Sequence, residues 1–191
     1  MTRRLFPALR KPSRGLLGRA ALLALGLILA APALCHARDE HVLRVHKSAR
    51  KMELLVGDRV VRTFQVGLGL SPLGDKEKQG DMRTPEGEFF VAIKNPRSDF
   101  HRFIGLSYPM PRHAKRGVEA GLVDERVLSR VESAARKRRV PPQTTSLGGY
   151  VGIHGGGAGS DWTWGCIAVS DAEVEWLFDT LRLGDRIVVL P

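Results

Sequence analysis

The chain has 191 residues and a formal net charge of +10, and 43% of its residues are hydrophobic. It is long enough for one domain with a sizeable core, and the lack of an internal repeat or a long low-complexity linker excludes a repeat array. The positive charge lies largely in the N-terminal segment, so it is no evidence for nucleic-acid binding.

Residues 1–37 have the pattern of a cleaved export signal. Six basic and no acidic residues precede an apolar run at 20–31 that is short for a membrane-spanning helix. Small residues at the −3 and −1 positions predict cleavage after Ala37, with cleavage after Ala33 as a second option. An uncleaved anchor and a lipoprotein modified at Cys35 are the alternatives, and contact with a membrane is expected only in those cases.

Loss of this leader changes both the charge and the cysteine content. Removing six basic residues lowers the net charge from +10 to +4, and Cys166 becomes the only cysteine left. A single thiol in an exported protein has no internal disulfide partner and is exposed to oxidation. A functional thiol is therefore a better interpretation than a buried apolar cysteine, which is the alternative.

The remaining chain predicts a mostly β domain with a few helices, spanning 38–191. Gly57-Asp58 is a two-residue hairpin signal, and Thr84-Pro85-Glu86-Gly87 predicts a turn. Apolar and β-branched runs predict strands at 42–46, 51–56, 59–66, 88–93, 102–106, 150–153, 166–169 and 186–190.

Two helices are expected. Ser170 and Glu173 form a capping box that opens a helix over 171–181. A second helix over 124–138 has Val127, Leu128 and Val131 on its inward face and ends before Pro141-Pro142. The segment 110–149 that contains it interrupts the strand pattern, and we expect either a surface insertion with a solvated basic face or a lid over the site.

The stretch from Tyr150 to Val169 carries the chemistry. A short apolar run leads to His154 and a glycine-rich loop, and a Thr-Trp-Gly turn twelve residues later leads to Cys166. A thiolate is the reactive nucleophile, and an adjacent imidazole takes the thiol proton and returns it to a leaving amine. The pairing predicts a thiol pKa below the free value of about 8.5.

The neighbours of this pair suggest the remaining parts of an acyl-transfer site. The Gly155 carbonyl is a candidate acceptor for the imidazole N–H, and backbone N–H groups at Trp164, Gly165 and Cys166 are candidate oxyanion donors. Three other interpretations stay open: Asp161 as a turn cap, the tryptophans at 162 and 164 as packing, and a zinc site that adds His113 to the pair.

These residues resemble the catalytic signature of the YkuD-type L,D-transpeptidases, which use cysteine to cross-link bacterial peptidoglycan. The signature match is His154-Gly, then Asp161-Trp-Thr-Trp-Gly-Cys-Ile-Ala-Val-Ser170. Upstream matches at 66–69, 80–87, 94–96 and 106–109 extend it over most of 42–191. The resemblance implies a β-sandwich-like fold with the thiol on a loop beside the sheet.

By the same resemblance, Cys166 is the nucleophile, His154 the proton acceptor and donor, and Gly155 orients the imidazole through its carbonyl. Gly165, Trp164 and Thr163 belong to the oxyanion and substrate region, to which we add Tyr108 and Arg83 as substrate-side candidates. For those two, a core hydroxyl and a turn-stabilising charge are the alternatives. No cofactor and no metal are implied.

Two residues depart from the common family pattern. The family often has His where this chain has Trp164, and Arg where it has Ala168. This version is similar to a murein endopeptidase-like branch, so the acyl acceptor is an amine or water. We expect a periplasmic or envelope L,D-transpeptidase acting on peptidoglycan stem peptides, with a carboxypeptidase or endopeptidase of the same fold, or a non-catalytic wall-binding module, as alternatives.

Overall fold

The computed structural model describes residues 40–191. The predicted export signal and Cys35 therefore lie outside the described residues. Within residues 40–191, none of the helices has the length and apolarity needed to cross a membrane.

Eight strands form one sheet in the order β3-β2-β1-β8-β4-β5-β6-β7. Most pairs are antiparallel, but β1–β8 and β6–β7 are parallel. The strands are β1 (His41–His46), β2 (Lys51–Val56), β3 (Arg59–Gln65), β4 (Gly87–Ser98), β5 (His101–Leu106), β6 (Gly152–His154), β7 (Ile167–Ala168) and β8 (Arg186–Leu190). The mostly β fold predicted from the sequence is confirmed.

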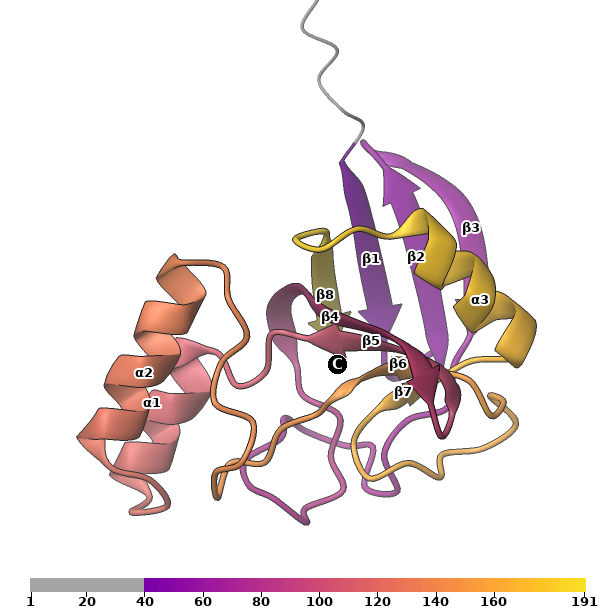
Figure 1. Cartoon of the computed structure of the whole chain (residues 1–191). Coiled ribbons are helices and arrows are strands. Elements are labelled where there is room, and N and C mark those ends of the chain that lie inside the picture. Colours follow the sequence, from indigo (N-terminus) through magenta and orange to yellow (C-terminus); the bar gives the residue numbers. More distant parts are fainter. Residues whose placement is uncertain (1–39) are drawn as a thin grey trace, which may run out of the picture. The chain divides into compact units, whose positions relative to one another are not determined.

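Strand β4 divides the sheet into two parts. Its first residues, Gly87 to Phe90, pair with β8, and the part from Val91 onward pairs with β5, with a register shift between Val91 and Ile93. A register irregularity bends and twists a strand. In Figure 1, β1, β2, β3 and β8 accordingly stand together while β5, β6 and β7 cross below them.

The core fills the space that these two parts enclose. One cluster of buried side chains joins Leu43 of β1, Phe64 of β3, Ile104 of β5 and Ile167 of β7. Ile153 of β6 belongs to the same cluster and is fully buried. His154 follows it in the strand, so core packing of Ile153 fixes the position of the histidine.

Helix α3 (Asp171–Thr180) closes one side of this core. Ser170 caps it as predicted: its hydroxyl accepts from the Glu173 N–H at 3.3 Å, and Glu173 Oε2 accepts from the Ser170 N–H at 2.9 Å. Val174 and Leu177 are buried on its inner face. The helix begins three residues after Ala168, so its cap also anchors the strand that follows the cysteine.

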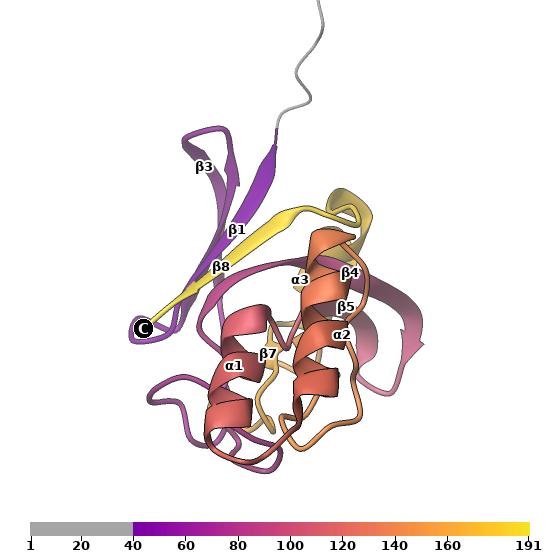
Figure 2. The ribbon, with the colours of Figure 1, turned by 90° about the vertical axis from the view of Figure 1, so that its left-hand side faces the viewer.

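The segment 110–149 folds as a helical hairpin. α1 (Pro111–Glu119) and α2 (Glu125–Arg136) lie side by side (Figures 1 and 2) around a small second core of Ala114, Val131 and Leu147. Sequence reasoning predicted α2 and missed α1. The inner face of α1 contains His113, Ala114 and Gly117 instead of large apolar residues, so it has no hydrophobic periodicity.

Candidate active site

His154 ends the short strand β6, which lies between β5 and β7. The backbone register places His154 opposite Phe103 on one side and Ala168 on the other. The imidazole Nδ1 is 2.6 Å from the Gly155 carbonyl oxygen. A carbonyl only accepts, so Nδ1 carries the proton in the neutral ring and Nε2 presents a free lone pair.

Two aromatic rings hold the imidazole in this orientation. Phe100 stacks on it with ring centroids 4.6 Å apart, and Trp162 approaches it edge-on at 5.5 Å. His154 is 3% exposed, and this burial lowers its pKa, against a smaller raising effect of the hydrogen bond to Gly155. The ring is therefore neutral at pH 7, which is the form a general base requires.

Cys166 lies immediately before β7, in the same pocket as the histidine. Pairing of Ile153 with Ile167 brings Cys166 beside Gly152, two residues before His154. Both side chains line a pocket of about 1190 Å³. Pairing of β6 with β7 thus places two residues that are twelve positions apart in the sequence at the same pocket.

The thiol is in its protonated form in this arrangement. Its sulfur lies 3.6 Å from the Tyr150 carbonyl oxygen, an acceptor that requires S–H as donor. Burial raises the pKa of Cys166, and the Gly152 N–H and the charge of Lys76 only partly oppose this. The sequence-based expectation of a lowered thiol pKa is wrong, because desolvation outweighs the polar neighbours.

Thr163 organises the loop before the cysteine. Its buried hydroxyl donates to the Cys166 carbonyl at 2.7 Å and accepts from the Gly165 N–H at 3.1 Å. The Gly165 N–H is therefore occupied and does not serve as an oxyanion donor. Within residues 40–191, no acceptor takes the N–H groups of Trp164 or Cys166, so these two remain candidates.

Gly165 is required by the geometry of this loop. Its φ is +125°, and a β-carbon there would lie 2.7 Å from the Arg83 carbonyl oxygen. Arg83 thus contacts the loop through its backbone. Its guanidinium points to Glu77, 3.0 Å away, and the side chain is not part of the pocket lining. Of the two interpretations of Arg83, a turn-stabilising charge therefore fits its contacts better than a substrate-side residue.

Tyr108 lies outside the pocket. It is fully buried, and its hydroxyl donates to the Leu147 carbonyl at 2.8 Å. Burial raises its pKa far above the ordinary value. The Tyr108 carbonyl accepts from Gln143 Nε2 at 2.8 Å, and Gln143 Oε1 accepts from the Tyr150 N–H at 2.7 Å. Tyr108 therefore supports the wall of the pocket and does not reach into it.

Asp161 and His113 also have structural contacts. Asp161 accepts from the Leu68 N–H at 2.9 Å and pairs with Arg50 at 2.6 Å. Both partners are distant in the sequence, so these contacts tie the loop to other segments and are not those of a turn cap. His113 Nδ1 accepts from the Met110 N–H, and its Nε2 lies 3.5 Å from Asp75. Its ring nitrogens are directed to these groups, so His113 does not join the cysteine in a zinc site.

Several residues of the site had no role in it assigned from the sequence. Phe100 lies in the β4–β5 connection, far from the motif, and its carbonyl accepts from the Gly155 N–H at 3.1 Å. Thr84 donates to the Cys166 carbonyl at 3.4 Å, and Asp171 accepts from the Gly156 N–H at 2.9 Å. Only tertiary contact reveals these roles.

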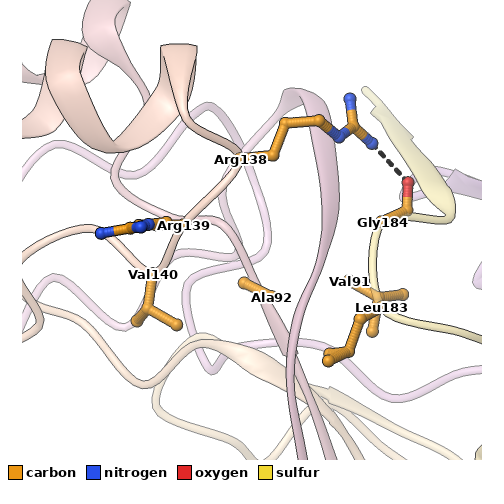
Figure 3. A pocket seen from close by; sticks show the side chains of 7 residues that line it. All are labelled: Val91, Ala92, Arg138, Arg139, Val140, Leu183 and Gly184. Carbon is orange, nitrogen blue, oxygen red and sulfur yellow. Dashed lines mark hydrogen bonds between the residues drawn. The ribbon is translucent and has the colours of Figure 1, made fainter.

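A second pocket of about 580 Å³ lies elsewhere on the domain and contains neither His154 nor Cys166. Figure 3 shows its lining, in which the Arg138 side chain reaches the carbonyl of Gly184, with Val91 and Leu183 below this contact in the view. The Arg138 guanidinium also lies over the Phe90 ring, 4.8 Å from its centroid. These contacts tie the end of α2 to the turn before β8.

A family model described as the L,D-transpeptidase catalytic domain, YkuD, matches residues 40–189. No curated protein matches the chain. Among solved structures, the helical cell shape determining protein Pgp2 from Campylobacter jejuni matches with a TM-score of 0.53 and 18% identity, over 78% of this chain and 47% of that one.

An L,D-transpeptidase from Xylanimonas cellulosilytica matches with a TM-score of 0.47 and 16% identity, over 81% of this chain and 62% of that one. The chain thus spans less than two thirds of the length of these structures. The likeness to Pgp2 shows a shared fold, and the family model covers most of the sequence. The chain therefore belongs to the YkuD family of L,D-transpeptidase catalytic domains.

Proposed function

We propose that this protein is a peptidoglycan-modifying enzyme, specifically an L,D-transpeptidase that works through a thioester on Cys166. Membership of the YkuD family supports a peptidoglycan-modifying activity. The thioester mechanism is supported by the pocket that Cys166 and His154 share, in which the imidazole is neutral and is oriented by the Gly155 carbonyl.

In the first half-reaction, His154 Nε2 takes the thiol proton while the sulfur attacks the carbonyl carbon of the third stem residue. The N–H groups of Trp164 and Cys166 stabilise the negative oxygen of the tetrahedral intermediate. The C–N bond to the terminal D-alanine then breaks. His154 gives its proton to the leaving amine, and the acyl group remains on sulfur as a thioester.

In the second half-reaction, an amine attacks the thioester carbon and His154 accepts its proton. The C–S bond breaks, the thiolate recovers the proton, and a new amide is released. Water in place of the amine yields a carboxylic acid, which makes the enzyme a carboxypeptidase or endopeptidase. Burial of His154 beneath Phe100 and Trp162 keeps this side of the pocket dry and favours the amine.

We further propose that the helical insertion shapes the substrate site. Residues 143–146 and 148–149 line the pocket, and Gln143 holds Tyr150 against the cysteine. The α1–α2 hairpin thereby acts on the site through the loop that follows it. We also propose that the protein works outside the cytoplasmic membrane, on the basis of the leader pattern at 1–37 and the location of peptidoglycan.

Acylation of the thiol tests this proposal directly. Purified protein is incubated with a carbapenem, a general acylating probe, and analysed by intact-mass and peptide mass spectrometry. We expect a single adduct on Cys166 that is absent from Cys166→Ala. An unmodified thiol in a folded protein would leave only the non-catalytic binding module.

The acceptor is tested with purified sacculi followed by muropeptide analysis. New cross-links between the third residues of two stems support transfer to an amine. Loss of existing cross-links, or release of stem residues without new cross-links, would contradict the transpeptidase proposal and support a hydrolase. The Cys166→Ala protein serves as the control in both arms.

A further inference from the structure

Lys76 places an ammonium group behind the loop that carries the nucleophile. Its side chain is 4% exposed, and Nζ lies 3.7 Å from the point where a β-carbon on Gly165 would sit. Gly165 directly precedes Cys166. The charge therefore lies against the backbone next to the thiol, at a position that the family motif does not include.

Asp81 fixes this ammonium in place. Its Oδ1 accepts from Lys76 Nζ at 2.6 Å, and the Lys78 carbonyl accepts a second Nζ hydrogen bond at 3.0 Å. The carboxylate also accepts backbone N–H groups from Glu77, Lys78 and Arg83, at 2.7 to 3.1 Å. Asp81 is thus held by the loop itself, and it holds Lys76 in turn.

The pair is oriented with its positive end toward the site. Lys76 lines the pocket and Asp81 does not. Among the lining residues Lys76 is the one lysine or arginine, and none is an aspartate or glutamate. The titratable side chains that share the pocket with the thiol are therefore Lys76, His154 and Tyr150, so the fixed charge that lines the pocket is positive.

We propose that Lys76 is a positioning residue that stabilises negative charge at the nucleophile, first on the sulfur of the Cys166 thiolate and then on the oxygen of the tetrahedral intermediate. Two of its three N–H groups are engaged by Asp81 and Lys78, so it acts as a fixed charge and not as a proton carrier. The effect on the thiolate stands on its own. The effect on acyl transfer rests on the proposed function.

The need for such a charge follows from partial burial of the thiol. Desolvation disfavours the thiolate, and a nearby cation is the ordinary means of offsetting it. Burial raises the pKa of Cys166 while the charge of Lys76 lowers it. His154 is neutral at pH 7 and so contributes no full charge before the proton is transferred.

The test is the pH dependence of alkylation of Cys166 by iodoacetamide. Lys76→Met removes the charge and keeps most of the side-chain volume. We expect the apparent thiol pKa to rise by about one unit, which is the lower end for a neighbouring charge because Asp81 offsets part of it. At a pH below that pKa, alkylation then slows about tenfold.

Matched variants separate charge from structure. Lys78→Met removes an exposed lysine from the same loop and should leave the profile unchanged. Lys76→Arg keeps the charge and should restore most of the shift. Asp81→Asn removes the opposing charge and keeps an acceptor, so it should lower the thiol pKa. If the role of Lys76 were merely structural, Lys76→Met and Asp81→Asn would shift the thiol pKa in the same direction.

An unchanged profile in folded Lys76→Met overturns the proposal. If that variant does not fold, Asp81→Asn decides: an unchanged or raised thiol pKa overturns it, and a lowered pKa supports it. Alkylation needs no peptidoglycan substrate. The proposal about Lys76 can therefore fail while carbapenem acylation succeeds, or hold in a protein that fails the transpeptidase assay.

Discussion

The hydroxyl of Thr163 donates a hydrogen bond of 2.7 Å to the carbonyl oxygen of Cys166. The same oxygen atom of Thr163 accepts from the Gly165 N–H, so one buried side chain closes the turn that presents the nucleophile. The turn is therefore closed before any substrate arrives. The N–H groups of Trp164 and Cys166, which have no acceptor within residues 40–191, remain available to a developing negative charge.

Replacing Thr163 by valine tests this closure. The shapes are similar, but the Gly165 N–H loses its acceptor and the Cys166 carbonyl keeps only the longer contact with Thr84. Unsatisfied buried polar groups cost about 1–3 kcal/mol each. We expect thermal unfolding at lower temperature together with slower carbapenem acylation. Thr163→Ser keeps the hydroxyl and should stay close to wild type; equal losses in both variants would contradict the role of the hydrogen bonds.

Replacing His154 by asparagine tests the general base. Asparagine can still donate to the Gly155 carbonyl but cannot take a proton at pH 7. We expect acylation to slow by about 10²–10⁴-fold, measured by time-resolved mass spectrometry. His101→Asn, at an exposed histidine paired with Glu175, should have little effect. Near-normal acylation in a folded His154→Asn would remove this histidine from the mechanism.

The pH dependence of acylation follows from the burial of His154. Its pKa is lowered, so the neutral base is lost only as the pH falls below the ordinary histidine value of about 6.5. The raised pKa of Cys166 places loss of the thiol proton on the alkaline side. We expect an acylation rate that is flat around pH 7 and declines only at a pH below the ordinary histidine value. A rate that rises steeply between pH 7 and 8 would disagree with a neutral resting pair.

Replacing Gly165 by alanine tests the fit of the loop against Arg83. A β-carbon there would lie 2.7 Å from the Arg83 carbonyl oxygen, and the φ of +125° is itself strained for alanine. We expect the loop to shift and acylation to fall by at least about tenfold, as for a small misplacement of catalytic groups. Gly121→Ala, at φ +67° with open space around it, adds backbone strain alone and should acylate normally.

The acid stability of the domain depends on Asp75. Burial alone would raise its pKa, but hydrogen bonds with His113, the Glu86 N–H and Arg116 outweigh burial and lower it strongly. The contribution of Asp75 to the stability of the folded domain is thus complete above its pKa in the unfolded chain, about 3.9, and is lost as the pH falls below that value. Asp75→Asn should unfold at lower temperature at pH 7 and lose less stability on acidification. Glu77→Gln, at an exposed carboxylate, should follow wild type.

Much of the fold was readable in the sequence. The limits of β2 and β8 agree with the predicted ranges, and the capping box placed α3. These features are local: alternating burial and one side-chain cap need no knowledge of distant contacts. The insertion was less readable, because α1 buries Gly117 against Leu147 and Val123 and so lacks an apolar stripe. Its partner α2 has an apolar stripe, which includes Val131 of the second core.

The candidate site divides in the same way. The residue types at His154 and Cys166, and the glycine that follows the histidine, were determined by the sequence alone, since a thiol, an imidazole and a flexible loop are chemical requirements. Only the tertiary structure decided that the resting thiol is protonated, that Thr163 occupies the Gly165 N–H, and that the Lys76 ammonium lies behind the loop. Protonation and hydrogen bonding depend on which distant groups surround an atom, and packing of the folded chain alone brings those groups together.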